Sequence, residues 1–305
     1  MFLSLCIPIY NTDIRLLAKE LHHQLLNISD EVELVFIDDA SEIDFKRKNR
    51  EVEAFCKYIE LDFNVGRAKI RNLFNSHTKG KYLLFLDGDS IIYNPKFLFN
   101  YCNFLKENKE KWLMGGRIDR SEKPHRRFLL RWEYSRNRES KTIQERMNNK
   151  YLGFKSNNFI IEKELFERFP FDESIRTYGH EDTLFGYSLF KNGFNCIQID
   201  NPVLNDDLDS NDLFLENTRH ALKNLVAISE KLNDTFFEDQ QVLLKKTKVV
   251  ANSIWRKIIV YSISPVLSPI LKFCLSKGYF KLWMFDLFRF IELFYILLGR
   301  KNKSN

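Results

Sequence analysis

The first 120 residues alternate between short apolar runs and longer amphipathic segments. Apolar runs of strand length occupy residues 2–9, 32–38, 57–61, 81–86 and 111–117. After the first run, apolar residues recur every three or four positions, the period of a helix, at Ile14, Leu17, Leu21, Leu25 and Ile28. Further helices are expected at residues 42–56, 66–77 and 95–107. Strands that alternate with helices predict an α/β domain with a mainly parallel sheet.

Two of these helices carry start signals. Asn11 and Thr12 are N-cap candidates for the first helix, and Asn94 followed by Pro95 is a favourable pair for opening the helix at 95–107. Beyond residue 117 the alternation weakens. The expected elements there are strands at 159–161 and 194–199 and helices at 181–192 and 212–232.

The composition changes near residue 236. Residues 258–276 carry one Lys and two Pro, and residues 280–299 are rich in aromatic residues but include Lys, Asp, Arg and Glu. Central charges are costly in lipid, so neither segment predicts a clean spanning helix. An amphipathic helical region over 236–305, lying on the inner surface of the membrane, fits better. Packing of these helices on the catalytic domain or on a second subunit is the alternative.

Charged side chains follow two of the predicted strands. Asp38 and Asp39 end one strand, and Asp87-Gly88-Asp89 ends another. Alternate residues of an extended strand point the same way, so Asp87 and Asp89 can converge on one ligand. Paired carboxylates repel each other unless a cation holds them, and a hard divalent cation suits oxygen ligands. The same run also suits a plain turn, and helix capping is the alternative role for Asp39.

The overall charge and the cysteines exclude several classes of protein. The formal net charge of +6 is mild, and no nucleic-acid reading module is visible, so no nucleic-acid partner is expected. The basic excess is local, with ten Lys or Arg against five Asp or Glu in residues 117–146. The five cysteines are dispersed and form no CxxC pair, which is typical of a reduced cytosolic protein. Met1 runs directly into an apolar strand without a signal peptide, so a cytoplasmic location is expected.

Five segments together resemble a known family. They are CIPIYN (6–11), IDDAS (37–41), NVGRAKIRN (64–72), LDGDS (86–90) and YGHEDTLFG (178–186). In this order and spacing they resemble the family 2 glycosyltransferases of GT-A fold, over about residues 2–235. The resemblance implies a catalytic domain over residues 1–235. It also implies transfer of a sugar from a nucleotide-sugar donor, with uridine diphosphate as the expected carrier, to a saccharide or lipid-linked acceptor of a bacterial surface polysaccharide or glycolipid.

The resemblance places the donor at the strand ends. Asp89 would ligate Mn²⁺ or Mg²⁺, which acts as a Lewis acid on the departing diphosphate. Arg71 would offer a forked cation to phosphate or base, although it could instead be a solvated helix residue. The residues implied in nucleotide-sugar binding are Pro8, Tyr10, Asn11, Asp38, Asp39, Gly66, Arg71, Asp87 and Gly88.

The resemblance places the catalytic acids at the start of the helix at 181–192. Asp182 matches the family's catalytic carboxylate, which accepts the proton of the acceptor hydroxyl in one inverting displacement, with Glu181 beside it. Their alternative role is to oppose the helix dipole. His180, Asn157 and Asn158 are candidate contacts on the acceptor side, and local structural roles are the alternative for each.

One position departs from the family pattern. Many relatives place a His after NPVL (201–204) that completes the metal site, whereas this chain has Asn205 followed by Asp206 and Asp207. An amide oxygen suits Mn²⁺ or Mg²⁺, so Asn205 is a doubtful third ligand.

Several other classes of protein fit the sequence less well than a glycosyltransferase. A haloacid-dehalogenase-like phosphatase or phosphotransferase also uses an Asp-x-Asp strand end, but normally on the first strand of its fold. A nucleotidyltransferase needs a Gly-rich, basic triphosphate loop after the first strand, and CIPIYNTD has none. A processive synthase would want long spanning helices and a Gln-x-x-Arg-Trp motif after the Glu-Asp pair, whereas Arg131-Trp132 precedes that pair. A non-catalytic membrane or scaffold protein would not need these motif carboxylates.

Overall fold

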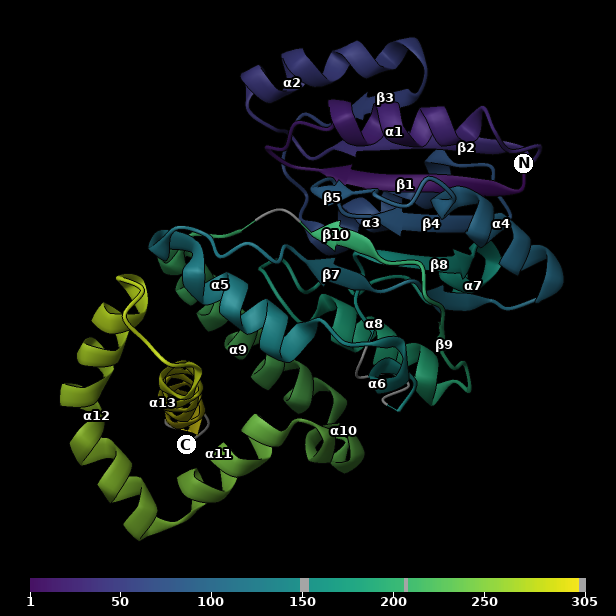
Figure 1. The fold of residues 1–305 in the computed structure, drawn as a ribbon. Coiled ribbons are helices and arrows are strands. Elements are labelled where there is room, and N and C mark those ends of the chain that lie inside the picture. The colour runs from purple at the N-terminus through teal and green to yellow at the C-terminus, as the bar shows by residue number, and fades with distance from the viewer. Residues whose placement is uncertain (149–153, 206–207, 302–305) are drawn as a thin grey trace. The chain divides into compact units, whose positions relative to one another are not determined.

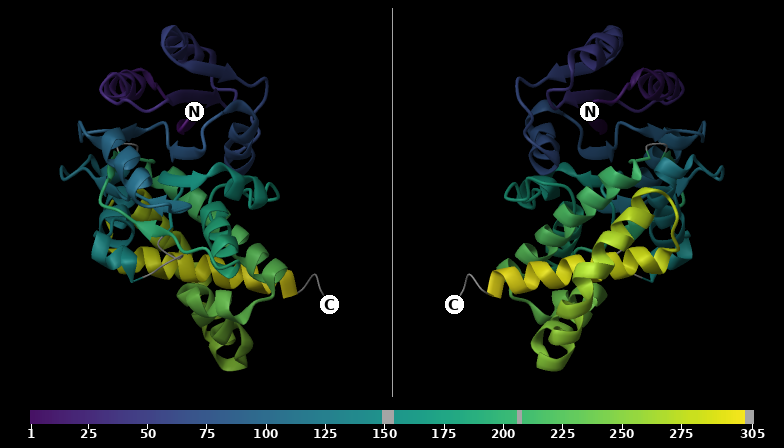
Figure 2. Two further views of the ribbon diagram at one scale, coloured as in Figure 1. Left: turned by 90° about the vertical axis from the view of Figure 1, so that its right-hand side faces the viewer. Right: turned by 90° about the vertical axis from the view of Figure 1, so that its left-hand side faces the viewer.

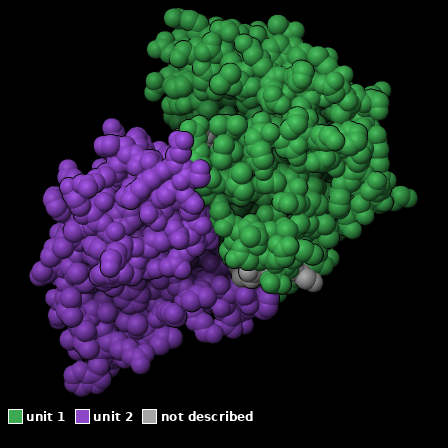
Figure 3. Space-filling view, viewed as in Figure 1, with its two compact units in different colours: residues 1–120, 140–176, 181–207 green, residues 121–139, 177–180, 208–305 purple. Residues whose placement is uncertain are grey.

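The computed structural model describes residues 1–148, 154–205 and 208–301 of the chain. These fall into two compact units (Figure 3). Unit 1 comprises residues 1–120, 140–176 and 181–207, and unit 2 comprises residues 121–139, 177–180 and 208–305. The compact units therefore do not follow the predicted boundary at residue 235. The assignment of residues 1–235 as the catalytic domain stays a prediction. Asp206 and Asp207, named with the metal site above, lie outside the described residues.

Unit 1 is built on a seven-stranded sheet with the order β3-β2-β1-β4-β8-β6-β9 (Figure 1). Its strands are β1 (Leu3–Ile9), β2 (Val32–Asp38), β3 (Lys57–Glu60), β4 (Tyr82–Leu86), β6 (Trp112–Met114), β8 (Asn158–Glu162) and β9 (Ile197–Gln198). Strands β1 to β4 are parallel, and β8 runs antiparallel to both β4 and β6. The predicted α/β class with a mainly parallel sheet is confirmed.

The helices of unit 1 cover the sheet according to the alternation of its strand residues. Leu3, Leu5 and Ile7 pack in one cluster with apolar residues of α1 and α4, whereas Cys6 packs in the other cluster with residues of α3, α7 and α8. The helices are α1 (Arg15–Leu25), α2 (Ile43–Asn49), α3 (Arg67–His77), α4 (Phe97–Glu107), α6 (Ile143–Met147), α7 (Lys163–Arg168) and α8 (Glu181–Lys191). Both faces of the sheet are therefore buried.

A small second sheet lies beside the end of β4. It has the order β5-β10-β7, from β5 (Ser90–Ile91), β10 (Val203–Asn205) and β7 (Arg117–Asp119). Its register pairs Asn205 with Ser90, directly after the Asp-Gly-Asp run. The single strand expected at 111–117 is thus two strands in different sheets, which the pattern of apolar residues could not show.

The predicted helix starts are wrong in two places. Helix α1 has Ile14 at its N-cap without a side-chain cap, and the Ile14 N–H donates to Asn49 Oδ1 (3.1 Å). Helix α4 begins at Phe97, because Asn94 instead forms a turn by accepting the Lys96 N–H (3.0 Å). The expected helix at 42–56 is α2 followed by the 3₁₀ turn Arg50–Ala54.

The cysteines behave as core residues. Each of them has a free thiol, and Cys6, Cys102 and Cys196 are buried. Burial raises the pKa of the Cys102 thiol to about 12, so it stays protonated and unreactive at neutral pH.

Unit 2 is helical. Its α-helices are α5 (Leu129–Tyr134), α9 (Asn211–Leu232), α10 (Thr235–Gln240), α11 (Val242–Asn252), α12 (Ile254–Ser276) and α13 (Leu282–Lys301), and Arg126–Phe128 and Ser135–Glu139 are short helical turns on either side of α5. Helix α13 packs against α9, α11 and α12 (Figure 2). Leu130, Phe214 and Phe285 belong to the core of this unit, and the Phe214 and Phe285 rings are stacked with their centres 5.3 Å apart.

Helix α12 differs from the other helices of unit 2 in its surface. By its length and composition it could cross a membrane, and little of it is buried. The prediction that this segment lies on the membrane surface and does not span the membrane stays a prediction. Its exposed large apolar residues are Ile254, Trp255, Ile258, Ile259, Tyr261, Ile263, Val266, Ile270 and Phe273.

Helix α1 provides a matched test of the core. Leu21 is fully buried and Leu16 is 83% exposed on the same helix. We expect Leu21→Ala to lower the free energy of unfolding by about 2–5 kcal/mol, because it leaves a cavity. Leu16→Ala should change it by less than about 0.5 kcal/mol. Urea unfolding followed by circular dichroism measures both, and equal effects would contradict the packing described here.

Candidate active site

The ends of β1 and β2 are joined by a network of polar contacts. The Asn11 N–H donates to Ser41 Oγ (2.8 Å), and Asn11 Oδ1 accepts the Glu42 N–H (2.8 Å). The Asp39 N–H donates to the Ile9 carbonyl (2.8 Å). Tyr10 lies between these contacts along the chain and is 56% exposed. The two strand ends thus form one rigid edge that presents the Tyr10 ring to solvent.

Asp38 and Asp39 are both buried, with different partners. Asp38 accepts the Ser41 N–H (2.7 Å) and the Tyr58 hydroxyl (2.9 Å). Asp39 accepts the N–H groups of Val65 (2.6 Å) and Gly66 (3.0 Å). Burial raises the pKa of Asp39 and so does the Asp38 charge, whereas the two N–H donors lower it. Neither Asp caps α2, whose N-cap is Glu42, so the helix-capping alternative is wrong.

The backbone held by Asp39 leads into α3. Gly66 is the N-cap of that helix and has φ of +86°, which a residue with a Cβ rarely adopts. A Cβ there would also stand 3.4 Å from the Arg176 carbonyl oxygen. Asp39 therefore fixes the start of the helix that carries Arg71.

The Asp-Gly-Asp run forms a turn at the end of β4. The Ser90 N–H donates to the Asp87 carbonyl (3.1 Å), and the Asp87 N–H donates to the Asn157 carbonyl (3.3 Å). A Cβ on Gly88 would stand 3.4 Å from the Pro8 carbonyl oxygen, which places the run against the end of β1. The Asp87 carboxylate is 30% exposed. The turn and the ligand roles are thus compatible, because the turn leaves Asp87 partly open to solvent.

Arg71 lies between the two acidic motifs. Its side chain is only 3% exposed, so the alternative of a solvated helix residue is wrong. Its guanidinium donates to Asp87 Oδ1 (2.9 Å) and to the Arg67 carbonyl (3.0 Å), and lies 4.0 Å from Glu181 Oε1. Arg71 therefore bridges the end of β4 and the start of α8.

Glu181 and Asp182 open α8 in different environments. The Glu181 side chain is 6% exposed, and Arg67 stands 3.8 Å from its carboxylate. Asp182 is 14% exposed and lies 3.2 Å from Lys155 Nζ. Asp182 also accepts the Thr183 N–H (2.7 Å). Lys155 was not singled out from the sequence, although it lies two residues before Asn157, which was.

Three acceptor-side predictions have separate outcomes. Asn158 is fully buried and bonded to the Tyr101 hydroxyl (2.6 Å) and to two carbonyls, so the prediction of a sugar contact is wrong for it in this structure. Asn157 is 9% exposed and lies beside Asp87 through its carbonyl. His180 belongs to unit 2 and has φ of +67°.

The oxygen donors near the end of β4 fit a hard divalent cation. Asp89 precedes Ser90, whose pairing partner is Asn205. Within the described residues no cluster of three or more His, Cys, Asp or Glu side chains could hold a metal by itself. A carboxylate and an amide oxygen supply few ligands, so diphosphate oxygens and water would have to complete the shell, as is usual for Mg²⁺.

Comparisons with known proteins give a family match for this chain. The model described as glycosyl transferase family 2 matches residues 4–169. Comparison with curated protein sequences gives no match.

Three solved structures share the fold at low sequence identity. S. aureus TarS 1–349 is 17% identical, with 97% of this chain and 91% of that chain covered and a TM-score of 0.53. The Pyrobaculum calidifontis mannosyltransferase PcManGT, in complex with GDP-Man and Mn²⁺, is 14% identical, with 97% and 86% covered and a TM-score of 0.60. Mycobacterium tuberculosis glucosyl-3-phosphoglycerate synthase, in complex with Mn²⁺, UDP and phosphoglyceric acid, is 14% identical, with 74% and 78% covered and a TM-score of 0.52.

The buried bridge can be tested against an exposed neighbour on the same helix. Arg71→Gln leaves Asp87 and Glu181 without their buried cation, and we expect it to lower the free energy of unfolding by about 3–5 kcal/mol. Arg67 is 54% exposed and also faces Glu181, so Arg67→Gln should cost less than about 1 kcal/mol. Urea unfolding measures both. Losses of similar size would mean that Arg71 is not the buried link between the motifs.

Proposed function

The chain belongs to glycosyl transferase family 2, and we propose that it moves a sugar from a uridine-diphosphate sugar to a hydroxyl of a saccharide or lipid-linked acceptor, with inversion. The observation that carries this proposal is the Arg71 bridge, which holds Asp87 and Glu181 within one compact unit. A donor site and a catalytic base must lie together for a single displacement, because the reacting groups have to meet in line.

The donor would lie along the edge formed by β1, β2 and β4. The exposed Tyr10 ring would stack on the base, with Pro8 and Asn11 bounding it, and Asp39 would hold the Gly66 backbone beside it. Asp87 would contact the ribose, and Gly88 would give the nucleotide room. TarS has been solved with UDP and with UDP-GlcNAc, which supports a uridine nucleotide for this chain.

A divalent cation would be held at the same edge. Asp89 would be its main protein ligand, and Asn205, which pairs with Ser90, would add an amide oxygen. Mn²⁺ or Mg²⁺ would neutralise charge on the leaving diphosphate when bound. PcManGT and glucosyl-3-phosphoglycerate synthase carry Mn²⁺ in their solved complexes, which supports this cofactor.

Asp182 would take the proton from the acceptor hydroxyl. Lys155 contacts Asp182 Oδ2 and the Thr183 N–H donates to Asp182 Oδ1, and these two contacts fix the orientation of the carboxylate at the start of α8. Glu181, held by Arg71 and Arg67, would shape the pocket beside it. Asn157 and His180 remain candidate acceptor contacts.

The acceptor would be met at the inner face of the plasma membrane. Unit 2 exposes large apolar side chains along α12, and the region 236–305 would lie against the lipid surface. A lipid-linked acceptor of a bacterial surface polysaccharide or glycolipid would be presented there.

Substitution of Asp89 tests the metal site. We expect the wild-type protein to hydrolyse at least one UDP-sugar slowly with Mn²⁺ or Mg²⁺ and to lose this activity in EDTA. Asp89→Ala should lower the rate by about a hundredfold or more, since metal stabilisation of the leaving group is worth several kcal/mol. Asp44 is exposed on α2, and Asp44→Ala is the control that should keep the rate. Unchanged hydrolysis in Asp89→Ala would remove this residue from the metal site.

Substitution of Asp182 separates chemistry from donor binding. Asp182→Asn keeps the shape of the side chain and removes the base, so donor turnover should fall by about 10²–10⁴-fold. Calorimetry with UDP and Mn²⁺ should give the wild-type affinity for this variant, with Asp44→Asn as the control for turnover. A variant that lost UDP binding as well would show that Asp182 supports the donor site instead of the proton transfer.

A further inference from the structure

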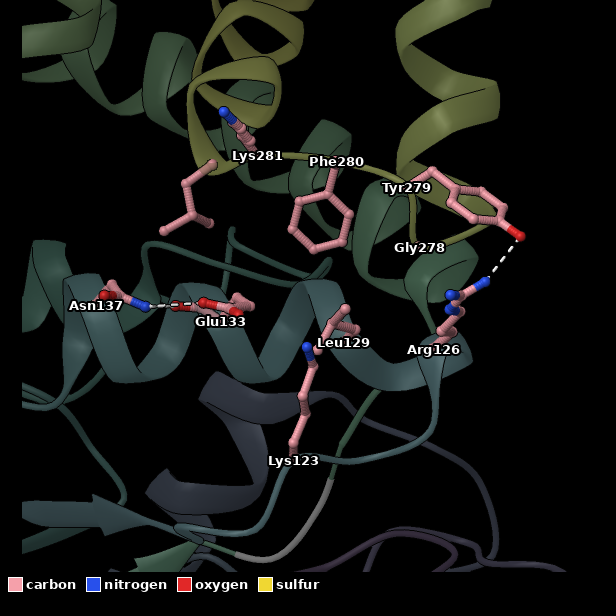
Figure 4. Close-up of a pocket in the computed structure, with 10 residues that line it drawn as sticks. Lys123, Arg126, Leu129, Glu133, Asn137, Gly278, Tyr279, Phe280 and Lys281 are labelled. Carbon is pink, nitrogen blue, oxygen red and sulfur yellow. Dashed lines mark hydrogen bonds between the residues drawn. The ribbon is translucent and has the colours of Figure 1, made fainter.

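Unit 2 contains a pocket whose lining includes none of the proposed catalytic residues. It has a volume of about 560 Å³ and is formed by two parts of the chain (Figure 4). One wall comes from the segment that includes α5, with Lys123, Arg126 and Glu133, and the other comes from the loop between α12 and α13, with Phe280 and Lys281. Figure 4 shows the Phe280 ring projecting from that loop toward the side of α5.

The two walls are tied together by a buried amide. Asn211 is fully buried, and its Nδ2 donates to the carbonyls of Arg126 (2.8 Å) and Ser276 (3.1 Å) while its Oδ1 accepts the Leu130 N–H (2.9 Å). Gly278 has φ of +74°, and a Cβ there would stand 2.6 Å from the Arg126 carbonyl oxygen. The loop can therefore approach Arg126 only because residue 278 is glycine. Specific contacts therefore fix the position of the two walls of the pocket.

The pocket lining favours an anion. Lys123, Arg126 and Lys281 line it together with one acid, Glu133, whose Oε2 accepts the Asn137 side-chain amide (3.1 Å). The Arg126 guanidinium donates to the Tyr279 hydroxyl (2.8 Å) and lies 4.7 Å from the centre of its ring. This contact leaves other N–H groups of the guanidinium for an oxyanion, because arginine has five donors.

The sequence around the loop indicates the source of that anion. Between Asp239 and Asp286 the chain has eight Lys or Arg residues and no Asp or Glu. Exposed aromatic side chains precede, occupy and follow this loop along the chain, at Phe273 (63%), Tyr279 (60%) and Trp283 (58%), and Tyr279 lines the pocket. Aromatic rings beside basic residues are typical of the boundary between lipid headgroups and acyl chains. A free phosphate would gain nothing from this apolar border, whereas a lipid would.

We propose that the pocket binds the phosphate headgroup of an anionic phospholipid, and this proposal rests on the membrane association proposed above. Lys123 and Arg126 would contact the phosphate oxygens, and Lys281, which points away from α5 in Figure 4, would swing in to join them. Glu133 could accept a hydrogen bond from a headgroup hydroxyl. Phe273 and Trp283 would lie in the interface beside the acyl chains. The site would orient unit 2 on the membrane through one specific lipid contact, in addition to the diffuse attraction of the other basic residues.

Vesicle sedimentation with charge-matched variants tests this proposal. Full-length protein is mixed with vesicles of phosphatidylcholine alone or of phosphatidylcholine and phosphatidylglycerol in equal parts. The pocket variant is Lys123→Gln with Lys281→Gln, and the control is Lys246→Gln with Lys257→Gln, which removes the same charge from exposed positions of α11 and α12. We expect the pocket variant to bind phosphatidylglycerol vesicles at least about tenfold more weakly than the control variant. Equal losses in the two variants would overturn the pocket and leave only diffuse attraction.

Calorimetry with a soluble lipid distinguishes the remaining outcomes. Dihexanoyl phosphatidylglycerol should bind the wild-type protein and the control variant but not the pocket variant, and it should bind more tightly than inorganic phosphate. Phosphate that bound as tightly as the lipid would overturn the lipid source. If the protein binds no vesicles, the proposed membrane association is wrong. Binding of the soluble lipid then decides by itself whether the pocket recognises a lipid headgroup. Hydrolysis of the UDP-sugar should be retained in the pocket variant, so failure here leaves the proposed transferase activity standing.

Discussion

The arrangement of the candidate site depends on one buried cation. Arg71 is almost inaccessible to water, and two carboxylates face its guanidinium, Asp87 from the end of β4 and Glu181 from the start of α8. A buried guanidinium without such partners would be strongly unfavourable. The three groups therefore have to be positioned together, and each fixes an element on which a proposed functional residue stands. The Arg71 side chain thus links the end of β4 to the start of α8, where the proposed donor and catalytic residues stand.

The sequence was most informative for buried strands, whose apolar residues form a clear run. Residues 32–38 were predicted as a strand and form β2 with those bounds, because their central run 34–37 is apolar and buried, as expected for a strand covered on both faces. The grouping of Asp39, Asp87 and the end of β1 also followed from the sequence, since parallel strands end at the same edge of a sheet. Their individual partners did not follow. Asp39 holds the backbone at Val65 and Gly66, 26 residues or more further along the chain, and no local pattern encodes such a contact.

Burial of polar side chains was the property that sequence reasoning missed most clearly. Asn158 looks like part of an exposed polar turn, yet it is satisfied in the core by Tyr101 and by the carbonyls of Gly116 and Asn201. Arg71 is similar, because an arginine on an amphipathic helix is solvated unless distant acids meet it. Unit 2 was missed for the same reason, since α5 and α9 join the C-terminal helices through contacts of Leu130, Phe214 and Phe285 that are far apart in sequence. Each of these features depends on contacts between residues far apart in sequence, whereas hydrophobic periodicity gives information only about residues close together in the chain.

Strand β8 runs antiparallel to β4. On the proposed roles, this direction puts the donor residues and the acceptor-side residues on different segments, so that each set can change separately in evolution. Because the strands are antiparallel, the chain arrives at Asn158 at the same edge where it leaves Leu86, and the Asp87 N–H meets the Asn157 carbonyl. On the proposed roles, the donor residues sit on outgoing ends of strands, whereas Lys155 and Asn157 come in on a single entering loop. Evolution could therefore replace that loop and change the acceptor, while the strands that read the nucleotide stay as they are.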